Sequence, residues 1–263
     1  MGDPGLMEPL KPVSPGARVA LGAGFFAVFI AAWGAATYGG WVPPLFLASP
    51  GRTLAAGWSL LTEFGFLGDI AVTIWRVVGG FLIAALMAVP LGLLMGAFKP
   101  IEAFFEPFLS FARYLPASAF IPLLILWAGV GEAQKLSVIV IGSVFQLVIM
   151  VAGVAGATRP DLVEAARTLG SGRMAILRRV VIPAAAPQIA ETLRLVLGWA
   201  WTYVIVAELI GATSGIGHMI MDSQRLLDTG QMIFGIAVIG IIGLVTDLLF
   251  KAANRRLFPW AVL

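Results

Sequence analysis

The chain has 263 residues, of which 60% are hydrophobic and 12% are charged, whereas soluble globular proteins carry about 25% charged residues. This composition excludes a typical soluble domain and indicates an integral membrane protein. Seventeen Lys and Arg against fourteen Asp and Glu leave a net charge of only +3, which argues against a nucleic-acid-binding surface. The absence of cysteine excludes disulfides, thiol nucleophiles and cysteine-ligated metals.

A polar tail at 1–18 precedes the first candidate span. The uncharged run that begins at Val19 is long enough to cross the roughly 30 Å hydrocarbon layer of a bilayer. We therefore expect a retained first helix over 19–38. A cleaved signal peptide is the alternative, because the run carries small residues at Ala35 and Ala36.

Five further apolar segments are long enough to cross a bilayer as helices, which satisfy their backbone hydrogen bonds locally. The predicted spans are 77–98, 114–131, 136–157, 192–212 and 231–250. The sequence therefore predicts an all-α integral membrane domain over 19–263 with six transmembrane helices.

Two other segments flank these spans. Residues 53–76 predict an external, partly interfacial helix, and residues 101–113 predict an amphipathic helix along the inner interface. Pro116 and Pro122 fall within the third predicted span. Each removes a backbone donor, so we expect this span to be bent.

Basic residues are distributed unequally between the two ends of the predicted spans. Eleven lie at one end: Lys11, Arg18, Lys99, Arg159, Arg167, Arg173, Arg178, Arg179, Lys251, Arg255 and Arg256. Three lie at the other: Arg52, Lys135 and Arg225. By the positive-inside rule, both termini and the loop at 158–188 are expected in the cytoplasm.

That loop has the helix signals of a soluble protein. Asp161 predicts an N-cap and Glu164 stands at the capping-box position. Gly170 predicts the end of a helix of about two turns. A second short helix is predicted over 173–181, stopped by prolines. One side of the first helix carries Leu162, Ala165, Ala166 and Leu169. This narrow face favours a groove in a partner protein, with membrane lipid as the alternative.

The loop string EAARTLGSGRMAILRRVVIP resembles the EAA loop of ABC importer permeases. The matching positions are Glu164, Ala165, Ala166, Gly170, Val180, Ile182 and Pro183. FLSFARYLPASAFIPLLILWAGVGE, AELIGATSGIGHMI and DLLFKAANRRLFPW resemble the nitrate, sulfonate, taurine and bicarbonate subgroup, so that the similarity covers about 60–260.

The resemblance implies the inner-membrane permease subunit of a type I ABC importer in a bacterium. Its expected partners are two cytoplasmic ATPase subunits, a second permease copy as a homodimer, and a periplasmic or lipid-anchored solute-binding protein. The residues implied in ATPase coupling are Asp161, Glu164, Ala165, Ala166, Leu169, Gly170 and Pro183.

This chain is not expected to be an enzyme. A phosphate-binding P-loop requires Gly-Lys followed by Ser or Thr, and glycine precedes none of the lysines. ATP and Mg are therefore expected on the ATPase subunits, with no cofactor in this chain. The single histidine, His218, lacks the companions of a metal or catalytic site.

For the solute path, ionisable and polar groups within spans are the default candidates. These are Arg113, Ser143, Gln146 and Glu208. Helix packing is the favoured role for Glu208, and snorkelling to the interface is the ordinary explanation for Arg113 and Arg76, either of which could instead attract an anionic solute. For Ser143 and Gln146, hydrogen bonding between helices is the alternative to facing a cavity. Gly92 and Gly96 have a spacing that permits close helix packing. The subgroup implies a small anionic solute. An ATP-independent carrier or channel is the alternative function.

Overall fold

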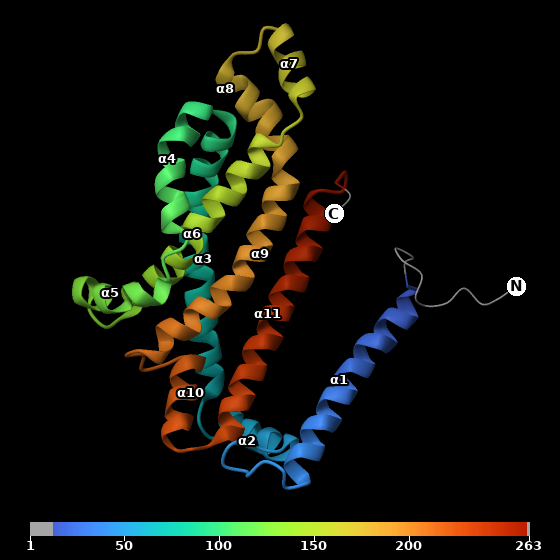
Figure 1. The fold of residues 1–263 in the computed structure, drawn as a ribbon, viewed down its shortest axis with the longest axis vertical. Helices are drawn as coiled ribbons and strands as arrows, with labels where there is room; N and C mark the ends of the chain where they lie inside the picture. Colours follow the sequence, from blue (N-terminus) through green and yellow to red (C-terminus); the bar gives the residue numbers. More distant parts are fainter. Residues whose placement is uncertain (1–12, 262–263) are drawn as a thin grey trace, which may run out of the picture.

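The computed structural model describes residues 13–261, and within them the chain is all-helical (Figure 1). The predicted tail at 1–18 therefore lies mostly outside the described residues. The helices are α1 Pro15–Tyr38, α2 Pro50–Thr62, α3 Phe66–Ala97, α4 Lys99–Ala112, α5 Ile121–Ala128, α6 Glu132–Gly156, α7 Pro160–Thr168, α8 Arg173–Ile176, α9 Ile182–Leu209, α10 Ile216–Arg225 and α11 Thr229–Leu257. A 3-10 turn, Ala117–Phe120, precedes α5, and a π-helical turn, Leu177–Val181, joins α8 to α9.

Five helices in this part of the chain are long and apolar enough to cross a membrane. They are α1, α3, α6, the continuous helix Arg173–Leu209, and α11. A sixth span is formed if the bent pair of α4 and α5 is counted as one. The all-α, six-span class predicted from the sequence is thus the observed architecture.

The third span differs from its predicted position. Its helical axis bends by 84° between Lys99–Ala112 and Ala117–Ala128, and α4 packs along α3 and α6 instead of forming a separate interfacial segment. Pro116 lies in the break because proline disfavours a helical conformation in the preceding residue. Pro122 is tolerated in the first turn of α5, where its missing donor costs nothing.

The second span is also longer than predicted. α3 begins at Phe66 rather than near Val77, and its 32 residues extend about 48 Å at 1.5 Å per residue. Asp69 and Arg76 lie inside this helix. Arg76 bounded the apolar run in the sequence, but within the fold its charge is paired with Glu132 and Glu208, and Asp69 accepts the Gly215 N–H. The helix predicted over 53–76 is therefore divided between α2 and the start of α3.

The core lies between α3, α6 and α9, and α3 with α6 forms the most extensive helix pair. Glycines allow their close approach. A Cβ built on Gly96 would lie 2.4 Å from the carbonyl oxygen of Ala152, and one on Gly92 would lie 2.8 Å from that of Val148. The small-residue spacing predicted to permit close packing therefore lies at the tightest part of the core.

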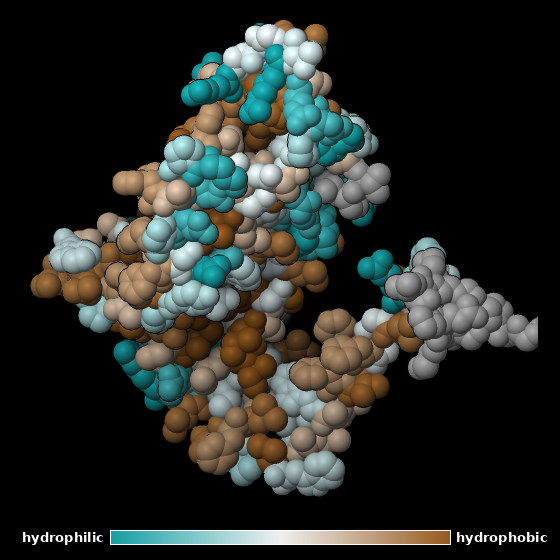
Figure 2. All heavy atoms as spheres, turned by 45° about the horizontal axis from the view of Figure 1, so that its top comes forward, coloured by the Kyte–Doolittle hydropathy of each residue, from teal (hydrophilic) through white to brown (hydrophobic). Residues whose placement is uncertain are grey.

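α1 stands apart from this core. None of its residues is buried, and it meets the rest of the chain through α2 and the segment before it. The start of α1, the end of α11 and the α7–α8 hairpin all point toward one end of the molecule, at the top of Figure 1. Hydrophilic side chains gather over the hairpin end, while apolar side chains cover much of the remaining surface (Figure 2).

Candidate functional sites

The α7–α8 hairpin projects beyond the ends of the other helices (Figure 1). Arg159, rather than Asp161, is the N-cap residue of α7, and no side chain makes a capping hydrogen bond. The predicted capping box with Glu164 is therefore wrong. Pro160 occupies the start of the helix, where its fixed φ is favourable, so that Asp161 falls inside the first turn. There its carboxylate still complements the helix dipole.

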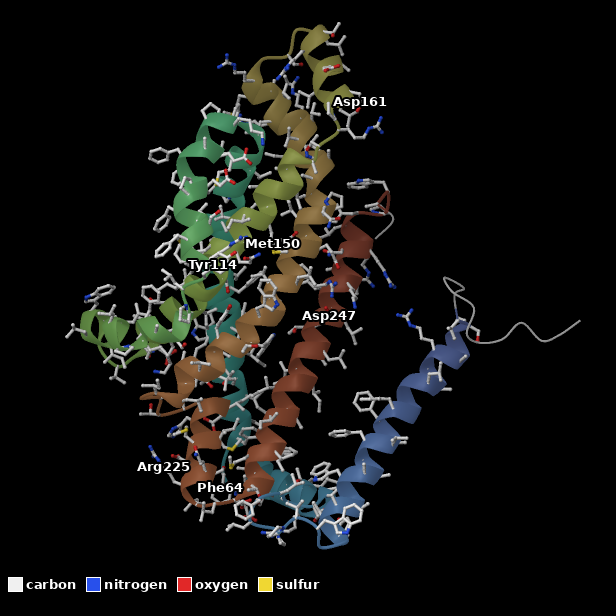
Figure 3. All side chains as sticks on the ribbon, viewed as in Figure 1. Phe64, Tyr114, Met150, Asp161, Arg225 and Asp247 are labelled. Atoms are coloured by element: carbon white, nitrogen blue, oxygen red, sulfur yellow. The ribbon has the colours of Figure 1, made fainter. Side chains whose placement is uncertain are left out.

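Asp161 instead forms an exposed ion pair with Arg159. A hydrogen bond from the Arg159 guanidinium holds the pKa of the Asp161 carboxyl below its usual value. The pair lies at the base of the hairpin, where Asp161 is visible in Figure 3. It stiffens the entry into α7 by satisfying both charges locally.

The apolar side of α7 is divided between the chain's own core and the solvent. Val163 and Ala166 pack against the core, whereas Leu162, Ala165 and Leu169 are exposed. Leu169 exposes 86% of its surface and Leu162 exposes 41%. Three of the four residues of the predicted face are therefore exposed. The fourth, Ala166, packs against the chain's own core instead.

Gly170 ends α7 as predicted. Its φ of +78° lies in the left-handed region that favours glycine. The Gly170 N–H donates to the carbonyl oxygen of Arg167 at 2.9 Å, and the Ser171 N–H donates to that of Ala166 at 3.0 Å. These bonds close the helix end in a Schellman-like turn.

The second arm of the hairpin does not stop at Pro183 and Pro187, so the prediction of a separate second helix is wrong. Arg173 to Leu209 forms one continuous helix of 37 residues. The π-helical turn Leu177–Val181 precedes Pro183, and its wider winding accommodates a residue that lacks an N–H and clashes with the preceding turn. The hairpin is thereby joined directly to the fifth span.

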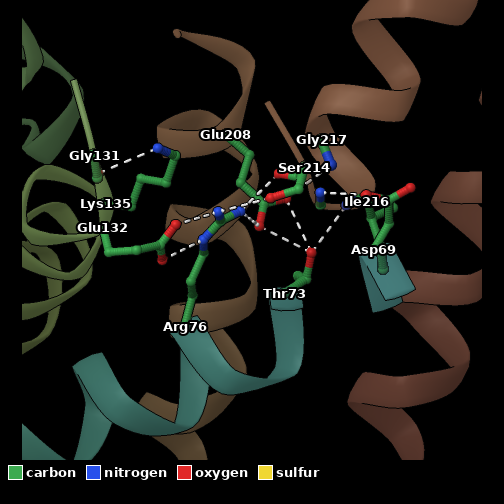
Figure 4. A network of polar contacts seen from close by, with 11 residues as sticks. Asp69, Thr73, Arg76, Gly131, Glu132, Lys135, Glu208, Ser214, Ile216 and Gly217 are labelled. Carbon is green, nitrogen blue, oxygen red and sulfur yellow. Dashed lines mark hydrogen bonds and ion pairs between the residues drawn. The ribbon is translucent and has the colours of Figure 1, made fainter. Parts of the chain in front are cut away.

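A buried polar network lies toward the opposite end of the molecule (Figure 4). Arg76 of α3 is 1% exposed, so the prediction that it snorkels from a span end is wrong. Its Nη1 donates to Glu208 Oε1 at 2.8 Å, and its Nη2 lies 2.5 Å from Glu132 Oε1. Glu208, whose side chain is fully buried, thus joins α9 to α3, which favours the helix-packing role over contact with solute.

The same network holds the loop that follows α9. Thr73 Oγ1 donates to Glu208 Oε1 at 2.9 Å and accepts the Ile216 N–H at 2.9 Å. Arg76 donates to the carbonyl oxygen of Ser214 at 2.7 Å, and the Gly217 N–H donates to Glu208 Oε2 at 2.8 Å. The Gly-rich stretch at 211–217 is therefore held in place by side chains from two helices, α3 and α9.

The sequence signalled only part of this network. Glu208 stood out as an acid within an apolar run, but nothing in the chain indicated Thr73 or Glu132. Asp69, which accepts the Gly215 N–H at 2.6 Å, was also missed. Polar residues near span ends carry no local sign of which distant backbone groups they will contact.

The candidates for the solute path separate into two groups. Arg113 and Gln146 line a cavity of about 440 Å³ beside the bend between α4 and α5. Ser143 and Glu208 do not line it; Ser143 is fully buried, and no hydrogen-bond partner for its hydroxyl lies within the described residues. The cavity also receives polar side chains that the sequence analysis did not select. These are Tyr114, Ser118, Thr202 and Tyr203.

His218 lies 3.2 Å from Asp222 in α10. Within residues 13–261, no group of three or more His, Asp or Glu side chains could hold a metal ion.

A polytopic helical bundle with a projecting hairpin and a cavity lined by polar side chains is an architecture typical of membrane transport proteins. The family model described as the binding-protein-dependent transport system inner membrane component matches residues 88–259. The chain belongs to this family. It is a non-catalytic permease subunit of an ABC importer in the inner membrane, and the ATPase of such systems is a separate subunit.

Curated relatives agree with this assignment. A probable ABC transporter permease protein of Brucella melitensis biotype 1 is 37% identical over 89% of this chain and 94% of its own length. The taurine transport system permease protein TauC of Escherichia coli is 34% identical over 92% of this chain and 90% of its own length. A putative aliphatic sulfonates transport permease protein SsuC of Bacillus subtilis is 33% identical over 89% of this chain and 85% of its own length.

Solved structures share the fold at low sequence identity. The MetNI methionine ABC transporter, crystallised in inward-facing conformations, matches with a TM-score of 0.67 and 17% identity over 73% of this chain and 95% of that chain. An amino acid ABC transporter matches with a TM-score of 0.61 and 20% identity, over 76% of this chain and 97% of that chain. The helical arrangement is therefore that of ABC transporter permeases.

Proposed function

We propose that this permease imports a small anionic solute as a homodimer, driven by two ATPase subunits that dock on α7 and the turn at Gly170. Members of the family work with ATPase and binding-protein partners. The observation that carries the docking assignment is the hairpin itself, which projects from the bundle and exposes 86% of Leu169. Both termini and this hairpin face the cytoplasm in the proposed orientation.

The chemistry of the hairpin supports a protein partner. A large apolar side chain that stays exposed on a short polar helix favours insertion into a complementary pocket. Glu164 and Ala165 lie exposed beside it, and Asp161 and Ala166 stabilise the helix from its base. Two permease copies would present two such hairpins to two ATPase subunits, which bind the ATP and Mg.

The helical connection supports force transmission. Arg173–Leu209 runs without interruption and extends about 55 Å at 1.5 Å per residue. It connects the hairpin to the cavity and then to Glu208 at the far network. Closure of the ATPase subunits around ATP would move the hairpins and thereby the spans, which is a rigid-body mechanism of alternating access.

An anionic solute is supported by the relatives. Their printed names concern taurine, aliphatic sulfonates and bicarbonate, all of which carry a negatively charged oxygen group. Arg113 in the cavity suits this charge. A periplasmic or lipid-anchored binding protein would deliver the solute from outside.

Single-cysteine cross-linking tests the docking assignment, because the natural chain contains no cysteine. In the assembled importer, Leu169→Cys is expected to cross-link to the ATPase subunit, whereas Thr62→Cys at the other end of the molecule is not. If Leu169→Cys captures only lipid while the ATPase stays bound elsewhere, the docking assignment fails.

Charge and backbone variants test coupling. Glu164→Lys and Gly170→Pro are expected to reduce solute uptake per ATP hydrolysed in proteoliposomes at least tenfold while leaving membrane insertion intact. Glu63→Lys, an equal charge change on an exposed residue far from the hairpin, serves as the control for ATPase binding. Uptake that continues without the ATPase subunit would instead favour an ATP-independent carrier.

A further inference from the structure

The surroundings of Arg76, Arg113 and Arg194 differ. Arg76 and Arg194 each pair with two carboxylates. Arg113 forms no ion pair with any carboxylate in the part of the chain that the structure describes; its side-chain partner there is the hydroxyl of Tyr114 at 2.9 Å. An arginine at membrane depth is costly unless an anion or water compensates its charge. Because Arg113 is exposed and lines a cavity, its guanidinium is accessible to an anion that enters there.

Arg113 lies midway along the bundle, and its side chain is exposed and lines the cavity beside the bend between α4 and α5. It follows the last residue of α4, and Tyr114 marks the bend in Figure 3, midway along the molecule. On the facing helix, Gln146 lies about 15 Å from one end of α6 and about 21 Å from the other at 1.5 Å per residue. Both side chains line one cavity near half the depth of the spans.

Tyr114 orients the guanidinium without neutralising it. The Arg113 guanidinium carbon lies 4.8 Å from the centre of the Tyr114 ring, and Nη2 donates to the Tyr114 hydroxyl. A guanidinium carries five N–H donors in a planar fork. Among the described residues, only the Tyr114 hydroxyl accepts a hydrogen bond from the guanidinium. The other donors form the geometry that receives a planar or tetrahedral oxyanion through two parallel hydrogen bonds.

The rest of the cavity wall suits a small organic anion. Gln146 and Thr202 supply hydrogen-bonding groups, while Trp199 and Tyr203 supply aromatic surface. The volume of about 440 Å³ lies near the lower end of the ~300–1,000 Å³ typical of small-molecule pockets. A solute with one oxyanion group and a short tail fits such a space.

We propose that this cavity is an anion-binding station for the transported solute, in which Arg113 pairs with a sulfonate, carboxylate or similar oxyanion and Trp199 and Tyr203 enclose its tail. The assignment rests on the proposed import function and adds the residues that recognise the charge. Because Thr202 and Trp199 lie on the helix that continues into the hairpin, movement of that helix alters the station and releases the anion.

The absence of native cysteine permits a direct test in the full-length chain reconstituted in lipid nanodiscs. Thr202→Cys places a thiol in the cavity. Its thiolate is reacted with the sulfonate-bearing reagent sulfonatoethyl methanethiosulfonate and, separately, with the cationic trimethylammonium-ethyl reagent. In each reaction the thiolate displaces methanesulfinate and forms a mixed disulfide. The measured quantity is the ratio of the anionic to the cationic reaction rate.

The ratio is expected to fall on the order of tenfold when Arg113→Gln is added to Thr202→Cys, because one nearby positive charge is lost. Arg113→Lys should retain most of the preference, and Tyr114→Phe should retain it because the guanidinium stays charged. Excess taurine should slow labelling of the parent Thr202→Cys chain, whereas choline should not.

If adding Arg113→Gln to Thr202→Cys leaves the ratio of anionic to cationic reaction rates unchanged, the proposal that this cavity is an anion-binding station is wrong. If that variant does not fold, absence of protection by taurine and methanesulfonate in the parent Thr202→Cys chain overturns it equally. Labelling requires neither ATP nor an ATPase. Failure of the station is therefore distinguishable from failure of the docking assignment, which is tested by cross-linking at Leu169→Cys.

Discussion

Arg76 and Glu208 lie 132 residues apart in the sequence, yet their side chains meet at 2.8 Å with 1% and 0% of their surfaces exposed. A lone buried charge in this position would be prohibitive, because an ion loses most of its solvation inside a protein or membrane. The pair is tolerated because Thr73 and the backbone of the 211–217 loop satisfy the remaining lone pairs of the carboxylate. The pair therefore fastens α3, α9 and this loop into one unit.

Removal of one partner is expected to be more harmful than removal of both. Arg76→Leu should destabilise the folded chain by about 3–5 kcal/mol, because Glu208 is left buried without a counter-charge. The double variant Arg76→Leu/Glu208→Leu should be more stable than Arg76→Leu alone. Thermal unfolding of the detergent-solubilised chain measures both effects.

Glu132 supplies the control for this comparison. It also pairs with Arg76, but its side chain is 52% exposed, so water can solvate the charge that remains. Glu132→Gln should therefore cost much less than Arg76→Leu. Strictly additive effects in the double variant would contradict a compensating buried pair.

Gly215 is expected to be essential for docking the 211–217 loop. Its φ of +109° is rarely accessible to other residues, and an added Cβ would lie 2.5 Å from the Glu208 carboxyl and 2.7 Å from Arg76. Gly215→Ala should displace the loop and expose it to limited proteolysis. Gly40→Ala is the matched control, since Gly40 also has a positive φ of +74° but open space around it. Equal proteolysis of the two variants would show that only backbone strain matters.

Gly96 should tolerate no side chain at the α3–α6 contact. A Cβ there would lie 2.4 Å from a backbone oxygen of α6, so the helices must separate, at a cost of about 1–3 kcal/mol. Gly153→Ala in α6 meets nothing within 4 Å and should be neutral or stabilising by up to about 1 kcal/mol. A comparison of the two melting temperatures in the same detergent tests the prediction. A smaller decrease in melting temperature for Gly96→Ala than for Gly153→Ala would refute the prediction.

The Arg159–Asp161 pair predicts a pH dependence at the hairpin. Because Arg159 lowers the pKa of Asp161 from its ordinary value of 3.8, the contribution of the pair is present above that value. It is lost as pH falls through the lowered pKa. The contribution is small because both groups are exposed. Carbon-13 NMR of aspartate-labelled chain should show the pKa of Asp161 rising in Arg159→Gln but not in Arg173→Gln. An unchanged titration would contradict the pair.

Features that depend on local chemistry could be predicted from the sequence. Long uncharged runs predicted helical spans because any backbone in hydrocarbon must satisfy its own hydrogen bonds. Gly170 predicted the end of α7 because the left-handed conformation there favours glycine. Pro116 predicted the bend near the third span for a similarly local reason. None of these inferences required knowledge of a distant contact.

Local rules failed where neighbouring structure outweighed them. Pro183 was expected to stop a helix, but the π-helical turn before it absorbs the missing donor and the steric clash. Asp161 was expected to cap α7, but the helix begins at Pro160 with its N-cap at Arg159, two residues earlier than expected. In both cases the error concerns a helix boundary, which neighbouring residues decide together with the residue that carries the local signal.

The sequence by itself determined that this is a helical membrane protein with a patterned loop, because composition and short-range spacing control helix formation in lipid. Only the tertiary structure decided that Arg76 is buried between two carboxylates while Arg113 has none in the described chain. Charge compensation depends on which helices contact one another, and these contacts cannot be inferred from a single sequence. The two arginines have the same chemistry, and their different neighbours assign one to structure and the other to the proposed anion station.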